Sequence, residues 1–382
     1  MTIMPVIVMI FVFVPSIILM ISMPYLTRET ISFGVTVSAV QFHSEPLRQM
    51  RKSYARISAT LHTILFIVCI ICLIYGDEHS KQQSWIIVTY SLAMVVISLV
   101  INISYHFKMK SLLPMLPIAL EPSIIAVDTG FRKRNINLSS KWFLIHVFII
   151  VVGIVTVLLN YELIPDQIPI HYNSSWNVDG YAAKSYSSVF MPTIMQVFLI
   201  LVFIFENWSI RRVKQQVQPT DPNRSIRQDV TFRRTWSGFM ITASFLVVIL
   251  LSVVQLNMIS LLNINFAIPI VLIIIAFIIL YALALSFWAG QGGSRLEQSA
   301  DHSNFRPVHD DDKWLLGMIY FNRKDPNLIV EKRFGVGWGL NFGHPVCWLI
   351  FLGIIVLLVV VQQGLEVSTR LNRYINVCGN RR

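Results

Sequence analysis

The sequence predicts an all-α polytopic membrane protein with about eight transmembrane helices, and three observations lead to this fold class. The chain of 382 residues is 55% hydrophobic and only 13% charged, whereas soluble domains average about 25% charged residues. Its apolar residues gather in eight long stretches. Lys and Arg fall mainly on alternate connections between them, as in chains that cross a bilayer repeatedly. A soluble globular enzyme is therefore excluded.

Each predicted span is long enough, at 1.5 Å per residue, to cross a hydrocarbon core of about 30 Å. The first has no basic flank and no small-residue cleavage site, so we expect an uncleaved anchor. None has Asp, Glu, Lys or Arg at its centre, which argues against an ion-coupled pump. The predicted spans are 2–25, 57–75, 84–106, 142–160, 188–207, 235–257, 264–288 and 345–361.

The distribution of basic residues predicts the topology. In chain order the seven connections carry 5, 1, 6, 1, 7, 0 and 7 Lys and Arg, and the tail carries 4. Because basic side chains stay on the cytoplasmic side, the odd-numbered connections are predicted to be cytoplasmic and the N-terminus outside. The tail is then outside if the eighth stretch crosses the membrane, and cytoplasmic if that stretch only dips into it.

The net charge of +11 does not indicate nucleic-acid binding, because 25 of the 31 basic residues lie in the predicted cytoplasmic connections. There they suit the topology and contact with anionic lipid. We therefore expect a multi-pass protein of the cell membrane whose main partner is the lipid bilayer. The predicted regions are three spans with basic loops (1–141), two spans with an outer loop (142–207), two further spans (208–289), a cytoplasmic module (290–344), and the last span with the tail (345–382).

The outer connection 161–187 is the first informative loop. Its prolines favour extended backbone, on which His171 and Asn173 face the same way. A turn is predicted at 177–180, with Gly180 suited to positive φ, so that His171 and Asp179 can meet across it. We expect a compact cap, and its candidate site residues are Pro169, His171, Asn173, Asp179, Gly180 and Lys184.

Two interpretations of this cap are open. His171 is a possible general base with Asp179 beside it, but the loop offers only serines as nucleophiles and no metal-ligand constellation. Alternatively, His171 and Asn173 only hydrogen-bond the loop to the helices. No hydrolase, zinc-protease or Walker motif occurs in the chain, and we expect no catalytic residues, cofactor or metal. The run from His309 to Asp312 is interpreted as a solvated acidic segment rather than a cation site.

The sequence LPDQIPIHYN, followed by Asp179-Gly180 and Lys184, resembles a bacterial membrane domain that also forms the front part of the SdpI-type immunity proteins. The resemblance covers about 147–193, and the family's glycine shortly after the Asn is replaced here by Ser175 or Trp176. It implies an envelope protein without catalytic activity that gives immunity to, or senses, a membrane-active peptide. The implied partners are a secreted peptide toxin or a regulatory protein.

The second informative loop is the predicted cytoplasmic module. Apolar residues on both sides of the polar segment 322–327 predict a β-hairpin, and the glycines from Gly335 to Gly343 predict a flexible run into the last span. A phosphate-binding function for these glycines is weakly indicated, because no soluble helix follows them. The stretch also resembles an uncharacterised module that accompanies SdpI-type domains. The matching residues are Trp314, Gly317, Tyr320, Asn322, Asp325, Pro326, Val330, Lys332, Arg333, Gly335, Gly337, Trp338 and Asn341.

The alternative function is that of a transporter or flippase component. Eight spans suit it, and the lack of charge within them still permits movement of a lipid or apolar substrate. Inverted symmetry between the halves of the chain would support transport, but the sequence carries no convincing repeat.

Overall fold

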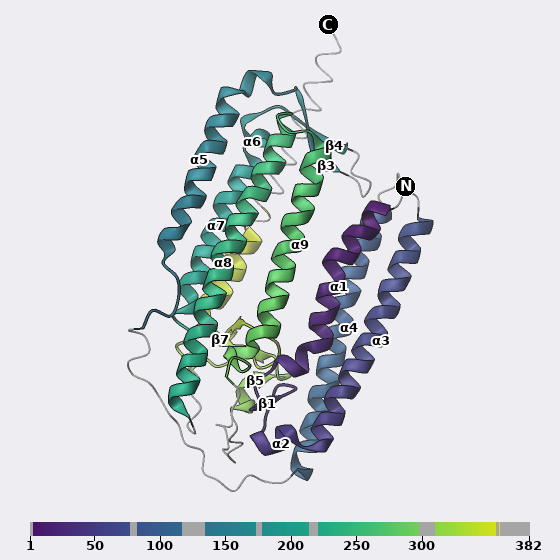
Figure 1. Ribbon diagram of the computed structural model, residues 1–382, viewed down its shortest axis with the longest axis vertical. Coiled ribbons are helices and arrows are strands. Elements are labelled where there is room, and N and C mark those ends of the chain that lie inside the picture. Colours follow the sequence, from purple (N-terminus) through teal and green to yellow (C-terminus); the bar gives the residue numbers. More distant parts are fainter. Residues whose placement is uncertain are drawn as a thin grey trace.

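Two groups of long helices stand side by side in the computed structural model (Figure 1). The structure describes residues 3–76, 82–116, 134–172, 178–213, 221–297, 310–356 and 359. Contacts between α1 and α9 join the two groups. The first group holds α1 (Ile3–Leu26), α3 (Glu45–Tyr75) and α4 (Gln82–Leu112); the second holds α5 (Phe143–Leu159), α7 (Met191–Ile210), α8 (Pro222–Met258) and α9 (Ile264–Ala289).

These seven helices are each long and apolar enough to cross a membrane. They coincide with seven of the eight predicted spans, so composition and structure together indicate a multi-pass membrane protein. The eighth stretch forms a shorter apolar helix over Pro345–Val356, and most of the residues after it lie outside the described part of the chain.

Apolar side chains cover both the inside and the outside of the helix groups. On α5, Phe143 and Ile150 are buried against α7 and α8, whereas Leu144 and Phe148 are each 68% exposed. An outer surface of this kind is unfavourable in water and suits contact with lipid tails. The fold is therefore consistent with a bilayer around the helices.

Two helices begin well before the predicted spans. α3 starts at Glu45 and α8 at Pro222, rather than at 57 and 235. Their additional turns are amphipathic: they carry exposed charges, yet they bury Tyr54 on α3 and Phe232 on α8. Hydropathy detects the membrane part of such a helix and misses its polar extension.

Four antiparallel hairpins occur in the described part of the chain. They lie at the two ends of the helix groups: β3 and β4 at one, near the start of α1, and β1, β5 and β7 at the other (Figure 1). The pairs are β1 (Ile31–Ser32) with β2 (Val35–Thr36), β3 (Gln167–Tyr172) with β4 (Val178–Ala183), β5 (Trp314–Leu315) with β6 (Ile319–Tyr320), and β7 (Ile329–Glu331) with β8 (Trp338–Leu340).

We call the end with β3 and β4 the cap end, and the opposite end the module end. The cap comprises residues 160–172 and 178–190, with the short helix α6 (Tyr186–Val189), and the module comprises residues 310–344. The first connection, with α2 (Ala39–His43), lies beside the module. This placement of the connections relative to one another agrees with the alternation of charge, while the side of the membrane that each end faces stays a prediction.

The hairpin predicted across 322–327 is wrong. β6, before this segment, pairs with β5, and β7, after it, pairs with β8. The first turn is made by Leu316 and Gly317, which both have positive φ, and the second contains Gly335 and Gly337, also with positive φ. The glycines are thus part of a hairpin rather than a flexible run, because they supply the backbone conformation that its turn requires.

Candidate functional site

The β3–β4 hairpin brings His171 and Asp179 together. The Nδ1 atom of His171 is hydrogen-bonded to Oδ1 of Asp179, and both side chains are exposed. Gly180 lies opposite His171 without positive φ, so the predicted reason for this glycine is wrong. A Cβ at position 180 would lie only 2.8 Å from Cβ of His171, and the glycine therefore permits close approach of the strands.

The other candidate residues of the cap are placed differently. Lys184 does not join the His171–Asp179 pair: its ammonium group donates to the carbonyls of Ile164 at 3.0 Å and Glu162 at 3.3 Å. The same group lies 4.9 Å from the centre of the Tyr161 ring. Lys184 thus connects the end of the β3–β4 hairpin to the start of the cap at residues 161–164. Asn173 lies outside the described residues.

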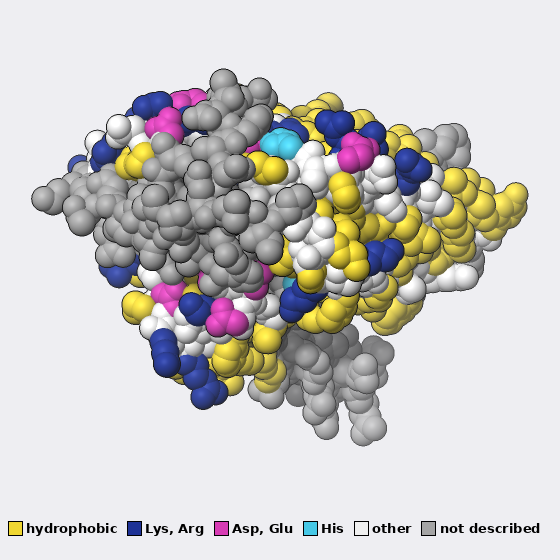
Figure 2. All heavy atoms as spheres, turned by 90° about the horizontal axis from the view of Figure 1, so that it is seen from below, with side chains coloured by type: hydrophobic (Ala, Val, Ile, Leu, Met, Phe, Trp, Pro, Cys, Tyr) yellow, Lys and Arg dark blue, Asp and Glu magenta, His cyan; other side chains and the backbone are white. Residues whose placement is uncertain are grey.

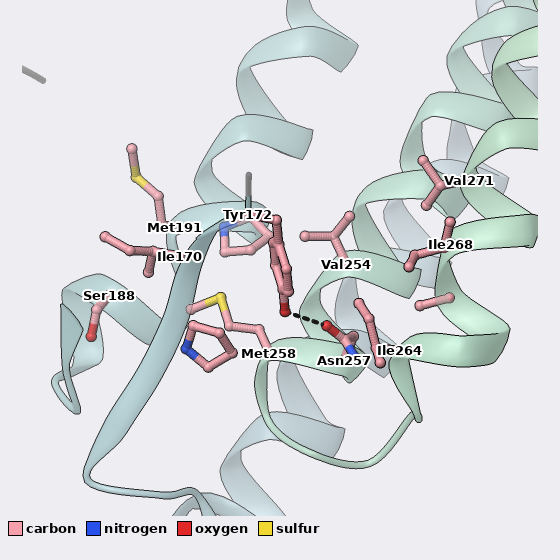
Figure 3. A pocket seen from close by; sticks show the side chains of 13 residues that line it. Ile170, Tyr172, Ser188, Met191, Val254, Asn257, Met258, Ile264, Ile268 and Val271 are labelled. Carbon is pink, nitrogen blue, oxygen red and sulfur yellow. Dashed lines mark hydrogen bonds between the residues drawn. The ribbon is translucent and has the colours of Figure 1, made fainter. Parts of the chain in front are cut away.

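A cavity of about 240 Å³ lies between the cap and the ends of α7, α8 and α9 (Figure 3). Pro169 lines it, and the hydroxyl of Tyr172 points into it and donates to Oδ1 of Asn257 at 2.7 Å. Burial raises the pKa of Tyr172, which keeps this hydroxyl a donor. The remaining lining residues are Ile170, Ser188, Met191, Pro192, Val254, Met258, Ile264, Ala267, Ile268 and Val271.

The module builds a small core from the residues predicted for it. The rings of Trp314 and Tyr320 lie 4.9 Å apart and are buried with Val330. Tyr320 donates its hydroxyl to Asp325 at 2.9 Å, and burial raises the pKa of Tyr320 to about 12. These contacts give Trp314, Tyr320 and Asp325 a structural function in the module.

Asn341 holds the polar segment 322–327 in place. Its Oδ1 atom accepts from the backbone N–H of Asn322 at 3.0 Å, and its Nδ2 atom donates to the carbonyl of Asn322 at 2.9 Å. Pro326 is exposed in this loop. Trp338 packs against Phe232 of α8, with ring centres 5.5 Å apart, and so attaches the module to the second helix group.

Arg333 attaches the module to the first connection. Its guanidinium is buried, forms ion pairs with Asp310 and Asp311, and donates to the carbonyl of Gly34 at 3.1 Å. Asp311 also accepts from the hydroxyl of Thr36 at 2.6 Å. Two carboxylates of the acidic run therefore bind an arginine. Within the described residues, no group of three or more His, Cys, Asp and Glu side chains is arranged to hold a metal ion.

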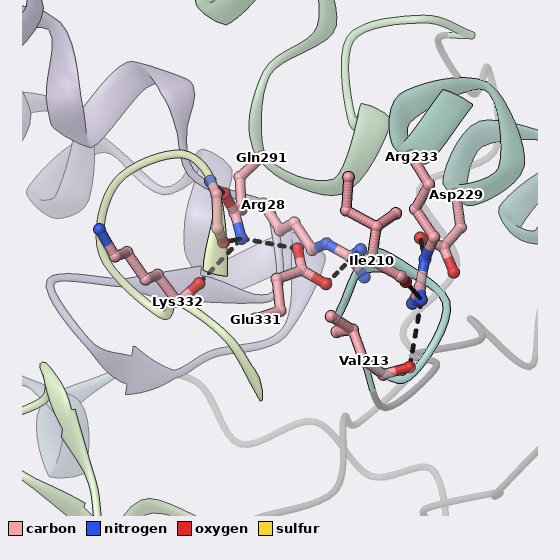
Figure 4. A network of polar contacts seen from close by, with 9 residues as sticks. Arg28, Ile210, Val213, Asp229, Arg233, Gln291, Glu331 and Lys332 are labelled. Carbon is pink, nitrogen blue, oxygen red and sulfur yellow. Dashed lines mark hydrogen bonds and ion pairs between the residues drawn. The ribbon is translucent and has the colours of Figure 1, made fainter. Parts of the chain in front are cut away.

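A buried junction that the sequence did not predict lies at the module end (Figure 4). Arg28, two residues after α1, donates to Glu331 of β7 at 2.7 Å, and both side chains are less than a tenth exposed. Gln291, just after α9, donates to the same carboxylate at 2.7 Å and accepts from the N–H of Gly337 at 2.9 Å. Burial raises the pKa of Glu331, and Arg28 opposes this effect.

The second helix group adds another ion pair to this junction. Arg233 of α8 donates to Asp229 at 2.8 Å and to the carbonyl of Ile210 at 2.8 Å. The charge of Asp229 raises the pKa of Glu331, and the charge of Arg233 lowers it. Figure 4 shows the Arg28–Glu331 and Asp229–Arg233 pairs next to each other. We use the name junction for Arg28, Asp229, Arg233, Gln291 and Glu331. The sequence signal for this junction is Arg28 in the first connection, and the alternation of charge already accounts for a basic residue there.

Two similar turns meet beside the junction. Phe33-Gly34 and Leu316-Gly317 both have positive φ at their two residues, and each joins two short antiparallel strands. A Cβ on Gly34 would lie 2.6 Å from Cα of Gly317. The two glycines therefore let the turns touch backbone to backbone.

Basic side chains spread around the rim of the module end (Figure 2). Their position, next to the ends of the apolar helices, is where anionic lipid headgroups would lie in a bilayer. The exposed ones include Lys52, Arg56, Lys108, Lys110, Lys141, Arg211, Arg212, Arg323 and Lys324.

Comparisons with known families identify two parts of the chain. Residues 148–195 match a domain of unknown function, DUF1648, and residues 323–348 match a family of unknown function, DUF5808. The first is a membrane-associated family. No curated protein and no solved structure matches the chain. The cap with its flanking helices, and most of the module with the start of the last helix, are thus similar to two families whose functions are open.

Proposed function

We propose that this is a non-enzymatic protein of the bacterial cell envelope whose cap contacts a membrane-active peptide or a similar amphiphile. The contact would give resistance to that molecule or sense its presence. The observation that carries this proposal is the cavity under the cap, since its lining by described residues is almost entirely apolar and contains no charged side chain. Such a lining binds by burying apolar surface.

The composition of the cavity also favours binding over catalysis. Tyr172, Asn257 and Ser188 supply its polar side chains, and the hydroxyl of Tyr172 is already hydrogen-bonded to Asn257. His171 and Asp179 do not belong to the lining. A general base needs its substrate within hydrogen-bond reach, and none of the described lining residues is such a group.

α8 supplies a route from the cap to the module. Val254 and Asn257 of this helix line the cavity, and Asp229 and Arg233 of the same helix belong to the junction that holds β7. A ligand that shifts the cap end of α8 would act on both ends of one rigid element. This connection supports the sensing function, in addition to resistance through binding alone.

Survival of bacterial strains exposed to membrane-active peptides tests the proposal. Strains that lack or overproduce the protein are exposed to a panel of secreted membrane-active peptides, together with strains that carry His171→Ala or Asp179→Ala. We expect protection by the wild-type protein, weakened in the variants because the cap hairpin loses its cross-strand pair. Unchanged survival of the deletion and overproduction strains with every peptide would reject the proposal and favour transport of a lipid or apolar substrate.

A further inference from the structure

We infer that the cavity accepts the apolar part of a cationic amphiphile that reaches it from the bilayer. This inference rests on the proposed function, in which the cap end faces outward, and it adds the chemical class of the ligand. Four observations carry it: the depth of the cavity, its size, the state of its polar groups, and the charge of the cap above it.

The cavity extends below the cap to the level of the spans. Val271 lies two turns into α9, and Val254 lies within α8, one turn before its end. Val254 is 37% exposed, and a bilayer that covers the predicted spans would surround the helices at this level. A ligand can therefore enter sideways from the outer leaflet, as an amphiphile already inserted there would do.

The volume sets the size of the group that fits. An apolar cavity of about 150 Å³ holds a benzene molecule, so about 240 Å³ has room for an aromatic side chain or a short alkyl segment. A complete headgroup together with its chain would exceed this space. The cavity therefore accepts one apolar anchor, and the remainder of the ligand stays outside, against the cap.

The polar atoms of the lining have partners within the protein. Tyr172 donates to Asn257, Asn257 donates to the carbonyl of Leu262 at 2.9 Å, and Ser188 donates to the carbonyl of Ala183 at 2.8 Å. A charged group placed in the cavity would meet no counter-charge from these residues and would lose its hydration, which is strongly unfavourable. The charge of the ligand must therefore lie outside the cavity.

The cap outside the cavity is acidic. Glu162, Asp166 and Asp179 are all exposed, and Asp179 is also hydrogen-bonded to His171. Lys184, the only Lys or Arg in the connection, turns its ammonium group to backbone carbonyls and to the Tyr161 ring. Exposed carboxylates thus lie on the same cap whose β3 strand lines the apolar cavity, and Asp166 directly precedes that strand. This combination selects a positively charged head attached to an apolar anchor.

The inference is tested with three probes of equal chain length: dodecyltrimethylammonium, dodecyl maltoside and dodecyl sulfate, below their micellar concentrations. The full chain, with its four cysteines replaced and Ile170→Cys introduced, is placed in phosphatidylcholine nanodiscs. Ile170 lines the cavity and is 51% exposed, so maleimide labelling of this position reports occupation. We expect the cationic probe to slow labelling at about fivefold to tenfold lower concentration than the neutral one.

Two sets of variants separate the anchor from the head. Ala267→Phe fills the cavity and should abolish protection by every probe, whereas Ile273→Phe, at a position 67% exposed on the same helix, should change nothing. Glu162→Gln with Asp166→Asn, which leaves the His171–Asp179 pair intact, should reduce the preference for the cation and leave the neutral probe unaffected. The last pair is on the surface, so its result does not depend on repacking.

Each outcome has a defined meaning. Equal protection by the three probes, or a preference for the sulfate, would overturn the cationic class. Protection by none of them, or protection that survives Ala267→Phe, would overturn the cavity as the site. Selective binding of the cation without any survival phenotype would leave this inference standing and reject the proposed function.

Discussion

The guanidinium of Arg28 and the carboxylate of Glu331 form a buried ion pair of 2.7 Å between residues 303 positions apart in the chain. Arg28 follows α1 of the first helix group, while Gln291, which shares the same carboxylate, follows α9 of the second. β7 therefore lies between the two groups at the module end. The module is an integral part of the helix assembly rather than a separate appendage.

The first prediction concerns this ion pair. Glu331→Ala should lower the free energy of unfolding by about 3 to 5 kcal/mol, because it removes the carboxylate from a buried ion pair and leaves the other charge in place. Thermal unfolding of the purified protein in detergent measures the effect. Arg227→Ala, which removes an exposed ion pair with Glu297, is the matched control and should change stability little. Similar stability of the two variants would show that the pair does not hold the junction.

The second prediction concerns the turn after α9. Gly292 has φ of 57° and ψ of 24°, and a Cβ there would overlap the guanidinium of Arg28. Gly292→Ala should therefore destabilise the protein by more than the roughly 1 to 2 kcal/mol of left-handed backbone alone. Gly353→Ala, in a helix with open space around the added atom, should be neutral or slightly stabilising. The same unfolding assay compares them, and equal melting temperatures would refute the steric argument.

The third prediction is a pH dependence in the module. Burial raises the pKa of Tyr320 to about 12, above the value of about 10 for an unfolded tyrosine. The contribution of this residue to stability is thus fully present below pH 10 and is lost as the pH rises toward 12. Unfolding measured across this range should show a steeper loss for the wild type than for Tyr320→Phe. Parallel pH profiles would contradict the assignment.

The fourth prediction concerns the orientation in the membrane. Leu163→Cys, at a cap position 77% exposed, should react with a membrane-impermeant maleimide on intact cells, because the basic module end stays in the cytoplasm. Lys324→Cys, exposed in the module, should react only after the cells are opened. Both variants are made without the native cysteines, and the reverse pattern of labelling would invert the topology.

Hydropathy was sufficient to locate the long helices, because a helix that crosses lipid needs a long apolar stretch. Seven of the eight predicted stretches correspond to such helices. It misplaced the starts of α3 and α8, where Glu45 and Pro222 begin turns that are charged outside and buried inside. In the cap, the eight-residue spacing correctly predicted that His171 and Asp179 could meet. Local sequence contains that information, because the two residues are joined by a single hairpin.

The contacts that build the module end could not be predicted from local sequence. The pairing of Arg28 with Glu331 and the meeting of Gly34 with Gly317 depend on how distant segments pack. The hairpin across 322–327 was mispredicted because its flanking apolar residues fit a strand pattern, while Asn341 uses its side chain to bind Asn322 in place of a paired strand. Side-chain hydrogen bonds of this kind leave no periodic signal.

The most direct test of the central claim is survival of a deletion strain that produces either Ala267→Phe or Ile273→Phe, challenged with a membrane-active peptide against which the wild type protects. The two substitutions are the same in the residue that they introduce, and only the first fills the cavity under the cap. We predict that Ala267→Phe abolishes protection and that Ile273→Phe retains it at equal amounts of protein in the membrane. Full protection by Ala267→Phe would contradict the account.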